Sequence, residues 1–367
     1  MISLLEEKYL LRSKKLNKIE KLKEGIDPLD SLKNLENLEL NDADRSFFLK
    51  CFGCYYKEKT NDYMIKLRVT GAKLTALQAK TIGQIAQKYG NDYIDLTTRA
   101  QLELRYIKEE RLYEVLNLLD SVGLSSYQTG VDNFRGIVVD PLSTLSRSSI
   151  LDDRALTTQL EALFVKKEDQ IAKIPRKFNI GICGNYKNTA NIFTHDLAFA
   201  LAKKDGEYGY NIYLGGRVGV IATSGNVFVN DQEAVVFFQG VKELFQKYGF
   251  RDNRNKNRFH FLLKEVGISN FIKAVEEFTK YNFRNSGELL TSTKTDTALI
   301  EELQNGKKAY KFIVPSGIFS GTALIEASKL ALKYDGNIAL TIDQNFYITN
   351  SDESITQSEL YKRGETL

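Results

Sequence analysis

The sequence predicts an α+β protein in which two copies of one module flank a middle α/β region. The first observation is an order of strand, turn, helix and strand near residues 63–107 that returns near residues 310–347. The second is a local match between Leu96–Gln101 and Leu340–Asn345, which lie 244 residues apart. The third is the stretch between the copies, where strands bounded by glycines lead into two helices. Duplication of this kind predicts a pseudo-twofold pair of modules that share a sheet or enclose a cleft.

The length and composition are those of a multidomain globular protein. A chain of 367 residues is long enough for two or three domains, and 43% apolar with 27% charged residues is ordinary for them. No run of about 18 apolar residues predicts a transmembrane helix. The acidic start at Glu6 and Glu7 does not fit a signal peptide, so a cytoplasmic location is expected. The net charge is +4 with both signs interleaved, so neither a membrane nor a nucleic-acid partner is expected.

The cysteines exclude a disulfide framework, because the sequence has only Cys51, Cys54 and Cys183. Cys51 and Cys54 have the two-residue spacing of a redox or zinc half-site. No second pair exists, and the histidines are only His195 and His260, so these residues cannot form a four-cysteine metal site. The pair is therefore interpreted as packing residues, with a redox or zinc role as the alternative.

The chain divides into five predicted segments. They are a helical arm at 1–60, a first module at 61–172, a middle α/β domain at 173–285, a linker at 286–306 and a second module at 307–367. The arm is rich in Leu, Lys and Glu and breaks at Gly25–Pro28. Its apolar stripe should pack on another part of the protein, because isolated short helices are marginal in water.

In the first module, alternating residues predict strands and 3.6-residue spacing predicts helices. The elements in order are a strand at 64–69, a helix near 74–89, strands at 93–97 and 102–107, and a helix near 109–122. Thr75 is the expected N-cap of the earlier helix and Gly90 its stop. Lys66 and Arg68 should share one face of the first strand.

The middle domain opens with a strand around Ile174–Gly184, because Pro175 ends the helical pattern before it. Side chains alternate along a strand, so Lys177 and Asn179 should share a face. An ammonium beside an amide suits a small oxyanion. The alternative is a positively charged edge strand that resists aggregation.

Later in the middle domain, a strand at 210–214 and helices at 231–248 and 268–281 are expected. Between the helices, Arg251–Arg258 holds four cations in eight residues. A solvated face is the first interpretation of so short a run, with a nucleic-acid contact as the alternative.

The second module repeats the first with a strand at 310–314, a helix at 322–334 and a strand at 337–347. Its second helix has only begun at Ser358–Lys362 when the sequence ends at Leu367. We therefore expect an incomplete second copy with an unpaired sheet edge and an uncovered helix face.

Six segments in series resemble the sirohaem-dependent nitrite and sulfite reductase family, and the likeness covers most of the chain. They are Asn17–Asp27, Lys66–Gly71, Leu96–Arg99, Gly130–Arg135, Ile174–Asn179 and Asp196–Gly216. The resemblance implies duplicated ferredoxin-like half-domains around a middle domain of the nitrite/sulfite reductase type. It also implies an oxidoreductase that reduces nitrite or sulfite by six electrons, with sirohaem, a [4Fe-4S] cluster and an electron donor such as ferredoxin.

The resemblance also assigns residues. By it, Lys66, Arg135, Lys177 and Asn179 would surround the substrate anion, with Arg135 and Lys177 passing protons. The sirohaem carboxylates would be bound by Thr97, Arg99, Arg258 and Arg68. Such charge-assisted bonds are strong and compensate a buried anion. Asn179 stands where sulfite-reducing relatives have Lys and nitrite-reducing ones Asn, which favours nitrite.

The sequence also departs from the family pattern. Lys66 replaces the usual Arg, while Ala100 and Glu103 replace Gln. The four cluster-binding cysteines of the family have no counterpart among the three here, so the cluster ligands are expected from a second polypeptide or a missing region. The alternatives are a non-catalytic relative that binds a tetrapyrrole, an anion or a partner protein, and an unrelated α/β protein with chance basic strands.

Overall fold

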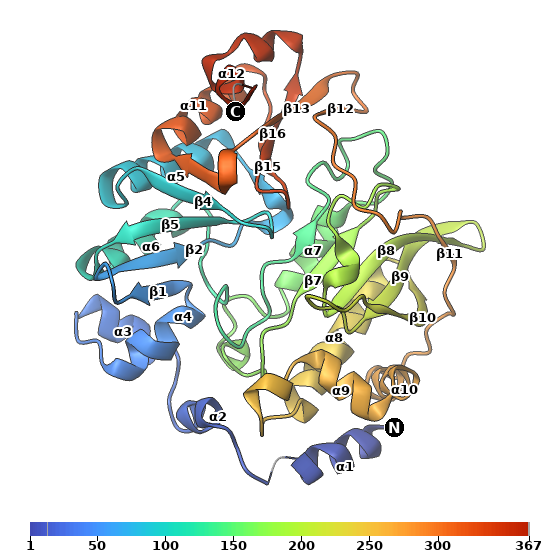
Figure 1. Ribbon diagram of the computed structural model, residues 1–367. Coiled ribbons are helices and arrows are strands. Elements are labelled where there is room, and N and C mark those ends of the chain that lie inside the picture. Colours follow the sequence, from blue (N-terminus) through green and yellow to red (C-terminus); the bar gives the residue numbers. More distant parts are fainter. Residues whose placement is uncertain (13, 366–367) are drawn as a thin grey trace.

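A computed structural model describes residues 1–12 and 14–365 and contains three β-sheets (Figure 1). Two of the sheets have five strands each, in the orders β1-β2-β5-β4-β14 and β12-β13-β16-β15-β3. The third sheet has the order β10-β9-β8-β7-β6, with β11 paired to β8. The first five-stranded sheet and the middle sheet lie on either side of the molecule, and the second five-stranded sheet lies between them at the C-terminal end.

The first sheet is built from the strands predicted for the first module. They are β1 (Cys54–Lys57), β2 (Asp62–Lys66), β4 (Tyr93–Leu96) and β5 (Leu102–Ile107), with helices α5 (Ala76–Tyr89) and α6 (Leu112–Asp120). Thr75 caps α5 as expected, because its hydroxyl accepts the N–H of Gln78 while the Gln78 side chain accepts the N–H of Thr75. The strand predicted at 64–69 ends earlier, at Lys66, and this difference separates Lys66 from Arg68.

The second five-stranded sheet has a counterpart for each of those elements. They are β12 (Ile300–Glu302), β13 (Lys308–Phe312), β15 (Ile338–Leu340) and β16 (Phe346–Ser351), with α11 (Gly321–Lys333) and α12 (Glu359–Glu365). Helix α12 corresponds to the second helix whose start was predicted at Ser358–Lys362. The single strand expected at 337–347 is wrong: Thr341–Asn345 forms a turn, where Gln344 has φ +62°, so the chain doubles back as a hairpin.

The two modules exchange an edge strand. β3 (Lys73–Leu74) from the first module pairs with β15 of the second, and β14 (Ile318–Ser320) from the second pairs with β4 of the first. Helices α5 and α11 pack closely, and a Cβ on Gly83 would lie 2.6 Å from the carbonyl oxygen of Gly321. The exchange gives the duplication its pseudo-twofold character, with each copy completing the sheet of the other.

The middle sheet carries the segment that the sequence analysis singled out. Its strands are β6 (Val138–Val139), β7 (Ile180–Cys183), β8 (Leu197–Lys204), β9 (Glu207–Leu214), β10 (Thr223–Val229) and β11 (Glu288–Leu289). Around it lie α7 (Asp153–Glu161), α8 (Asp231–Tyr248), α9 (Phe259–Val266) and α10 (Ile268–Thr279). The strand predicted around Ile174–Gly184 is shorter, because β7 begins at Ile180 and Lys177 and Asn179 precede it. The edge-strand alternative is wrong, because β7 runs parallel to and between β6 and β8.

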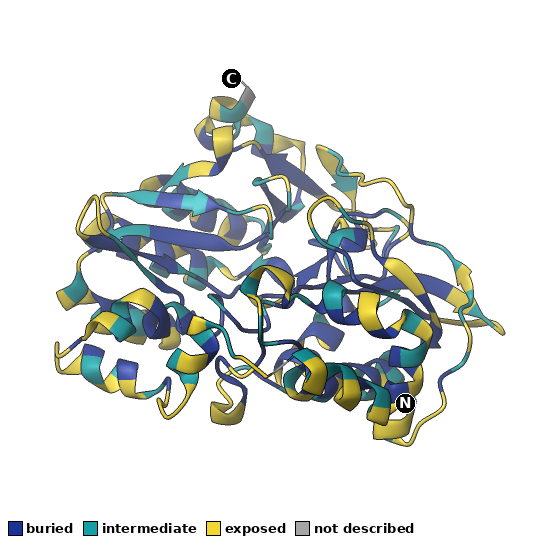
Figure 2. Cartoon of the chain, turned by 60° about the horizontal axis from the view of Figure 1, so that its bottom comes forward, coloured by how far each residue is buried: buried dark blue, intermediate teal, exposed yellow. Residues whose placement is uncertain are grey.

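The N-terminal arm consists of α1 (Ile2–Arg12), α2 (Lys18–Lys23), α3 (Asp30–Glu36) and α4 (Leu49–Cys51), with a π-helical turn at Asp44–Phe48. Helix α1 lies against α8, α9 and α10 and buries Leu5, as the apolar stripe predicts. Leu10 and Leu11 are more than half exposed, so only part of the stripe is covered. Figure 2 shows this alternation of buried and exposed turns along the helices at the N-terminal end.

The three cysteines are buried and unpaired. Burial raises the pKa of the Cys51 and Cys54 thiols to about 12, so both stay protonated near neutral pH, as packing residues would. Among residues 1–12 and 14–365, no group of three or more His, Cys, Asp or Glu side chains is placed to hold a metal ion. No helix in the same ranges is long and apolar enough to cross a membrane.

Candidate anion and cofactor cavity

A cavity of about 310 Å³ lies where the first sheet meets the segment that leads into β7. It brings together Lys66, Arg135 and Lys177, which are far apart in the sequence. The lining residues are Lys66, Leu67, Thr97, Thr98, Arg99, Gln101, Leu102, Glu103, Thr129, Arg135, Gly136 and Lys177. Five of the eight residues singled out from the sequence therefore share one cavity, while Arg68, Asn179 and Arg258 do not line it.

The turn between β4 and β5 presents Arg99 to the cavity. The N–H of Thr97 donates to the carbonyl of Gln101 at 2.9 Å. The Thr97 hydroxyl oxygen accepts the N–H groups of Arg99 at 3.3 Å and Gln101 at 3.2 Å. Because these bonds use the oxygen as acceptor, the hydroxyl hydrogen of Thr97 remains for a ligand.

Gln101 joins this turn by hydrogen bonds to the neighbouring segment at Val69. Its Oε1 accepts the N–H of Val69 at 2.6 Å, and its Nε2 donates to the Val69 carbonyl at 3.2 Å. A Cβ on Gly136 would come within 3.2 Å of the same amide, so glycine leaves room for it. The cavity wall is thereby braced by a buried side chain that the sequence analysis did not select.

Lys66, at the end of β2, forms an ion pair with Glu103 of β5. The two residues are directly opposite in the sheet register, which places their side chains on one face. Glu103 also forms an ion pair with Arg105, whose Nη2 lies 3.1 Å from Oε2 of Glu103. The Glu103 carboxylate is therefore paired with two cations.

Arg135 and Lys177 come from two segments joined by backbone bonds. The N–H of Arg135 donates to Phe178 O at 2.9 Å, and the N–H of Phe178 donates to Asn133 O at 3.1 Å. The Arg135 guanidinium donates to the carbonyls of Thr129 and Val131, while its Nε is buried without a partner among the described residues. Lys177 has no ion pair within the described ranges.

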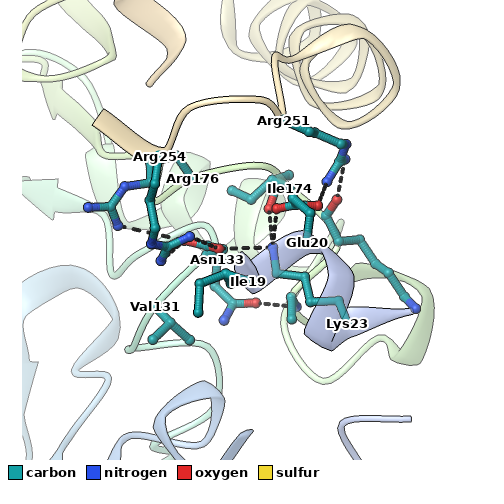
Figure 3. A network of polar contacts seen from close by, with 12 residues as sticks. Ile19, Glu20, Lys23, Val131, Asn133, Ile174, Arg176, Arg251 and Arg254 are labelled. Carbon is teal, nitrogen blue, oxygen red and sulfur yellow. Dashed lines mark hydrogen bonds and ion pairs between the residues drawn. The ribbon is translucent and has the colours of Figure 1, made fainter. Parts of the chain in front are cut away.

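Figure 3 shows a buried polar network that holds the segments carrying Arg135 and Lys177. The carboxylate of Asp132, which is fully buried, accepts hydrogen bonds from Nη1 and Nη2 of Arg254 at 2.7 and 2.8 Å. It also forms an ion pair with Lys23, whose Nζ lies 2.9 Å away. Glu20 of α2 pairs with Lys23 at 2.7 Å and with Arg251. Although burial acts to raise the pKa of Asp132, Lys23 and Arg254 hold it below its usual value.

Three of the four cations at 251–258 are therefore paired with buried acids, and the first interpretation of this run as a solvated face holds only for Lys256, which is exposed. Arg251 and Arg254 pair with the acids just described, and Arg258 pairs with fully buried Asp196 at 2.6 Å. The reason is long-range pairing with acids at 20, 132 and 196, which the local charge pattern does not show.

Asn179 is joined to the same Asp196. Its backbone N–H donates to Oδ2 of Asp196 at 2.9 Å, and its own Oδ1 is buried without a hydrogen-bond partner in the described residues. Asn179 and Arg258 thus meet at Asp196, next to the cavity rather than on its wall.

Arg68 is turned away from the cavity. Its Nη1 lies 2.6 Å from Oε1 of Glu161, and its other nitrogens donate to backbone carbonyls that include Phe134 O at 3.0 Å. The expected shared face with Lys66 is wrong, because the chain leaves the β2–β5 ladder and the N–H of Arg68 bonds to Ser125 O instead.

The electrostatics of the cavity are those of crowded cations. Burial and the nearby Arg135 lower the pKa of Arg99 to about 10. Burial and four guanidinium groups, with Arg135 the largest contributor, lower the pKa of Lys177 to about 8. Burial and Arg99 lower the pKa of His195 to about 3, so this buried ring is neutral. An anion bound among these groups would relieve their repulsion.

The atoms present fit an anionic group that accepts hydrogen bonds. Nη1 of Arg99 and Nε of Arg135 are buried donors without partners among the described residues. Such atoms carry a desolvation cost unless a ligand accepts their hydrogen bonds. Gln101, Glu103, Asp132 and Asp196 were not selected as site residues from the sequence. The available signals were the repeat for Gln101, two segments of the family resemblance for Asp132 and Asp196, and the departure from the family pattern for Glu103.

Comparison with known families gives two matches along the chain. Residues 56–122 match the nitrite/sulfite reductase ferredoxin-like half domain. Residues 130–283 match the nitrite and sulphite reductase 4Fe-4S domain.

Curated relatives are similar over most of this chain. The ferredoxin–nitrite reductase of Synechococcus elongatus is 31% identical over 324 residues, which are 85% of this chain and 63% of the relative. The chloroplastic ferredoxin–nitrite reductase of Spinacia oleracea is 28% identical over 87% of this chain and 57% of its own length. The chain thus spans about three fifths of the length of these relatives.

A solved structure shares the fold. The Mycobacterium tuberculosis NirA protein superposes with a TM-score of 0.88 at 24% identity, over 96% of this chain and 70% of that chain. The prediction of an α+β fold with ferredoxin-like half domains is confirmed by this similarity and by the family matches.

Proposed function

Because the chain belongs to the nitrite and sulfite reductase family, we propose that it supplies the anion pocket and part of the sirohaem site of an enzyme that reduces nitrite, or sulfite, by six electrons. The observation that carries the proposal is the convergence of four cationic side chains on one cavity, two of them with buried donors that lack a partner among the described residues.

In this proposal the turn at 97–101 binds the cofactor. Arg99 and the Thr97 hydroxyl would hold carboxylates of sirohaem, since both have donors to spare. Arg68 and Arg258, which the family resemblance also assigns to the carboxylates, already have buried acidic partners. We propose that these two arginines hold the surrounding segments, Arg258 through Asp196.

Lys66, Arg135 and Lys177 would face the substrate anion, while Asn179, which the family resemblance also assigns to it, lies beside the cavity at Asp196. Lys177 suits proton delivery, because a pKa of about 8 lies near the working pH of a cellular enzyme. Arg135 stays charged and is held by two carbonyls, so it would orient the anion. Bound sirohaem would supply the redox chemistry, and the protein groups would bind, orient and protonate.

We propose that the ligands of the [4Fe-4S] cluster lie outside residues 1–367. The buried, protonated cysteines do not gather with other ligand side chains in the described residues. The named relatives favour nitrite as substrate and ferredoxin as donor, and Asn179 agrees with nitrite. The five-segment division, with a linker at 286–306, and the cytoplasmic location stay predictions.

The test is the absorption spectrum of the chain purified from cells that make sirohaem. We expect a Soret band with bound iron, and we expect Arg99→Met to lose most of it. The matched control is Arg111→Met, which removes an arginine that is 57% exposed and does not line the cavity. A colourless wild-type protein would contradict the proposal and favour a relative that has lost the cofactor.

A further inference from the structure

We propose that Glu103 sets the charge of the anion that the cavity prefers, favouring a monovalent oxyanion over a divalent one. This inference deepens the proposed function and rests on it, since it takes the cavity as the anion site.

Glu103 stands on the cavity wall and not merely near it. It lies on β5 between Lys66 of β2 and Asp95 of β4, with which it is in register on either side. Its side chain is only 9% exposed, and its carboxylate binds Lys66 and Arg105. Arg105 is shared with Asp95, so it balances that second carboxylate as well.

The charge count of the cavity depends on this residue. Four cationic side chains line the cavity, and Glu103 is the one acidic side chain among its lining residues. Because Glu103 forms an ion pair with Lys66, the charge left uncompensated is that of Arg99, Arg135 and Lys177. Attraction for a ligand grows with the product of the charges, so each added positive charge favours a divalent anion more than a monovalent one.

The second module shows that the fold does not need an acid at this position. Lys311 occupies the place of Lys66, and its register partner on β16 is Tyr347, not an acid. Lys311 instead takes its carboxylate from Asp343 in the turn, at 2.9 Å. Of the two modules, the first is therefore the one that pairs this lysine with an acid on the adjacent strand, and that acid faces the cavity.

The experiment compares Glu103→Gln with wild type in the purified, cofactor-loaded protein. Nitrate and sulfate are the probes, since their charges of one and two do not change near neutral pH, and calorimetry gives both affinities. We expect the sulfate-to-nitrate affinity ratio to rise roughly tenfold in Glu103→Gln. The amide can still accept hydrogen bonds from Lys66 and Arg105, which favours retention of the fold.

Three further variants make the test decisive. Lys66→Met should lower the ratio, because the cavity then loses one positive charge while Glu103 keeps its negative charge and only Arg105, which it shares with Asp95. The double variant should return the ratio toward wild type. Glu58→Gln makes the same charge change at an exposed turn and should leave the ratio unchanged. If Glu103→Gln does not fold, the ratio in Lys66→Met decides the matter.

The outcomes separate the two proposals. A wild-type protein that binds neither anion contradicts the proposed function. A wild-type protein that binds them, with a ratio that neither Glu103→Gln nor Lys66→Met changes, contradicts only the role of Glu103.

Discussion

The turns at Thr97–Gln101 and Thr341–Asn345 have the same backbone and opposite chemistry. In both, the threonine N–H donates to the carbonyl four residues on, at 2.9 and 3.0 Å. Both threonine hydroxyls accept an N–H at 3.2 Å. In both copies a side-chain amide oxygen, that of Gln101 or of Asn345, accepts the N–H of a valine on a neighbouring segment of the chain. The duplication therefore extends to individual hydrogen bonds.

The charges differ where the first turn carries Arg99 and the second carries Asp343. Asp343 neutralises Lys311, whose side chain is almost fully buried. Arg99 has no such partner among the described residues and faces a cavity. Duplicating a fold thus does not duplicate a site, because the site depends on a few side chains that the backbone tolerates in either form.

The largest expected effect comes from giving the first turn the residue of the second. In Arg99→Asp, a negative charge replaces a positive one among Arg135 and Lys177, so we expect nitrate affinity to fall on the order of a hundredfold. Titration calorimetry measures it. Arg111→Asp makes the same change on an exposed surface and should bind nitrate as wild type does; an equal loss in both variants would refute a special role for the turn.

The second effect concerns stability. Lys311→Met leaves Asp343 without its cation and should lower the free energy of unfolding by about 2 kcal/mol. Lys66→Met is the matched change in the first module and should lower it by less than about 1 kcal/mol, because Glu103 keeps Arg105. Urea unfolding measures both. An equal or larger loss in Lys66→Met would contradict this difference between the two lysines.

The third effect is a difference in pH dependence. Nitrate affinity due to Lys177 should be complete well below pH 8 and fall as pH rises through about 8, where this amine loses its proton. The folded pKa is below the usual 10.5, so the unfolded chain binds more protons between these values and the free energy of unfolding should rise there. Calorimetry across this range measures the affinity. Lys177→Arg should abolish the fall; an unchanged profile would contradict the assignment.

The second module should respond at the acid end instead. Burial acts to raise the pKa of Asp343, but Thr341 and Lys311 hold it below the usual 3.8. Its contribution to stability is therefore complete above pH 3.8 and is lost as pH falls through the lowered value. In Asp343→Asn, acid unfolding followed by circular dichroism should lose this component, and a profile identical to wild type would exclude it.

The smallest effect concerns the two threonines. Thr97→Val and Thr341→Val each remove a hydroxyl that accepts backbone N–H groups, and each should lower the free energy of unfolding by about 1 kcal/mol. Only Thr97→Val should also reduce cofactor content, measured from the Soret absorbance. A similar reduction in Thr341→Val would mean that the second turn also contributes to cofactor binding.

Local patterns predicted most of the fold. The helix at Asp231–Tyr248 and the Thr75 cap follow from periodicity and capping chemistry, which act within a few residues. The repeat predicted the two modules. The exchanged strands could not be predicted, because β3 and β14 have two and three residues and no periodicity of their own.

The candidate site was predicted in part, for a related reason. Lys66, Arg135 and Lys177 meet as expected, since they follow from motifs in three separate segments. The partners of Arg68 and Arg258 lie 93 and 62 residues away, at Glu161 and Asp196. Nothing in the local sequence distinguishes an arginine that will be neutralised by a distant acid from one that will remain available.

The strand exchange also bears on how the polypeptide matures at the ribosome. β4 has no outer neighbour until Ile318–Ser320 has been made, more than 200 residues after β4 itself. At about 5–20 residues per second, that interval is roughly 10–40 seconds. During this time β4 lacks the strand that pairs with it in the finished fold, so the nascent first sheet presents an open edge to its surroundings.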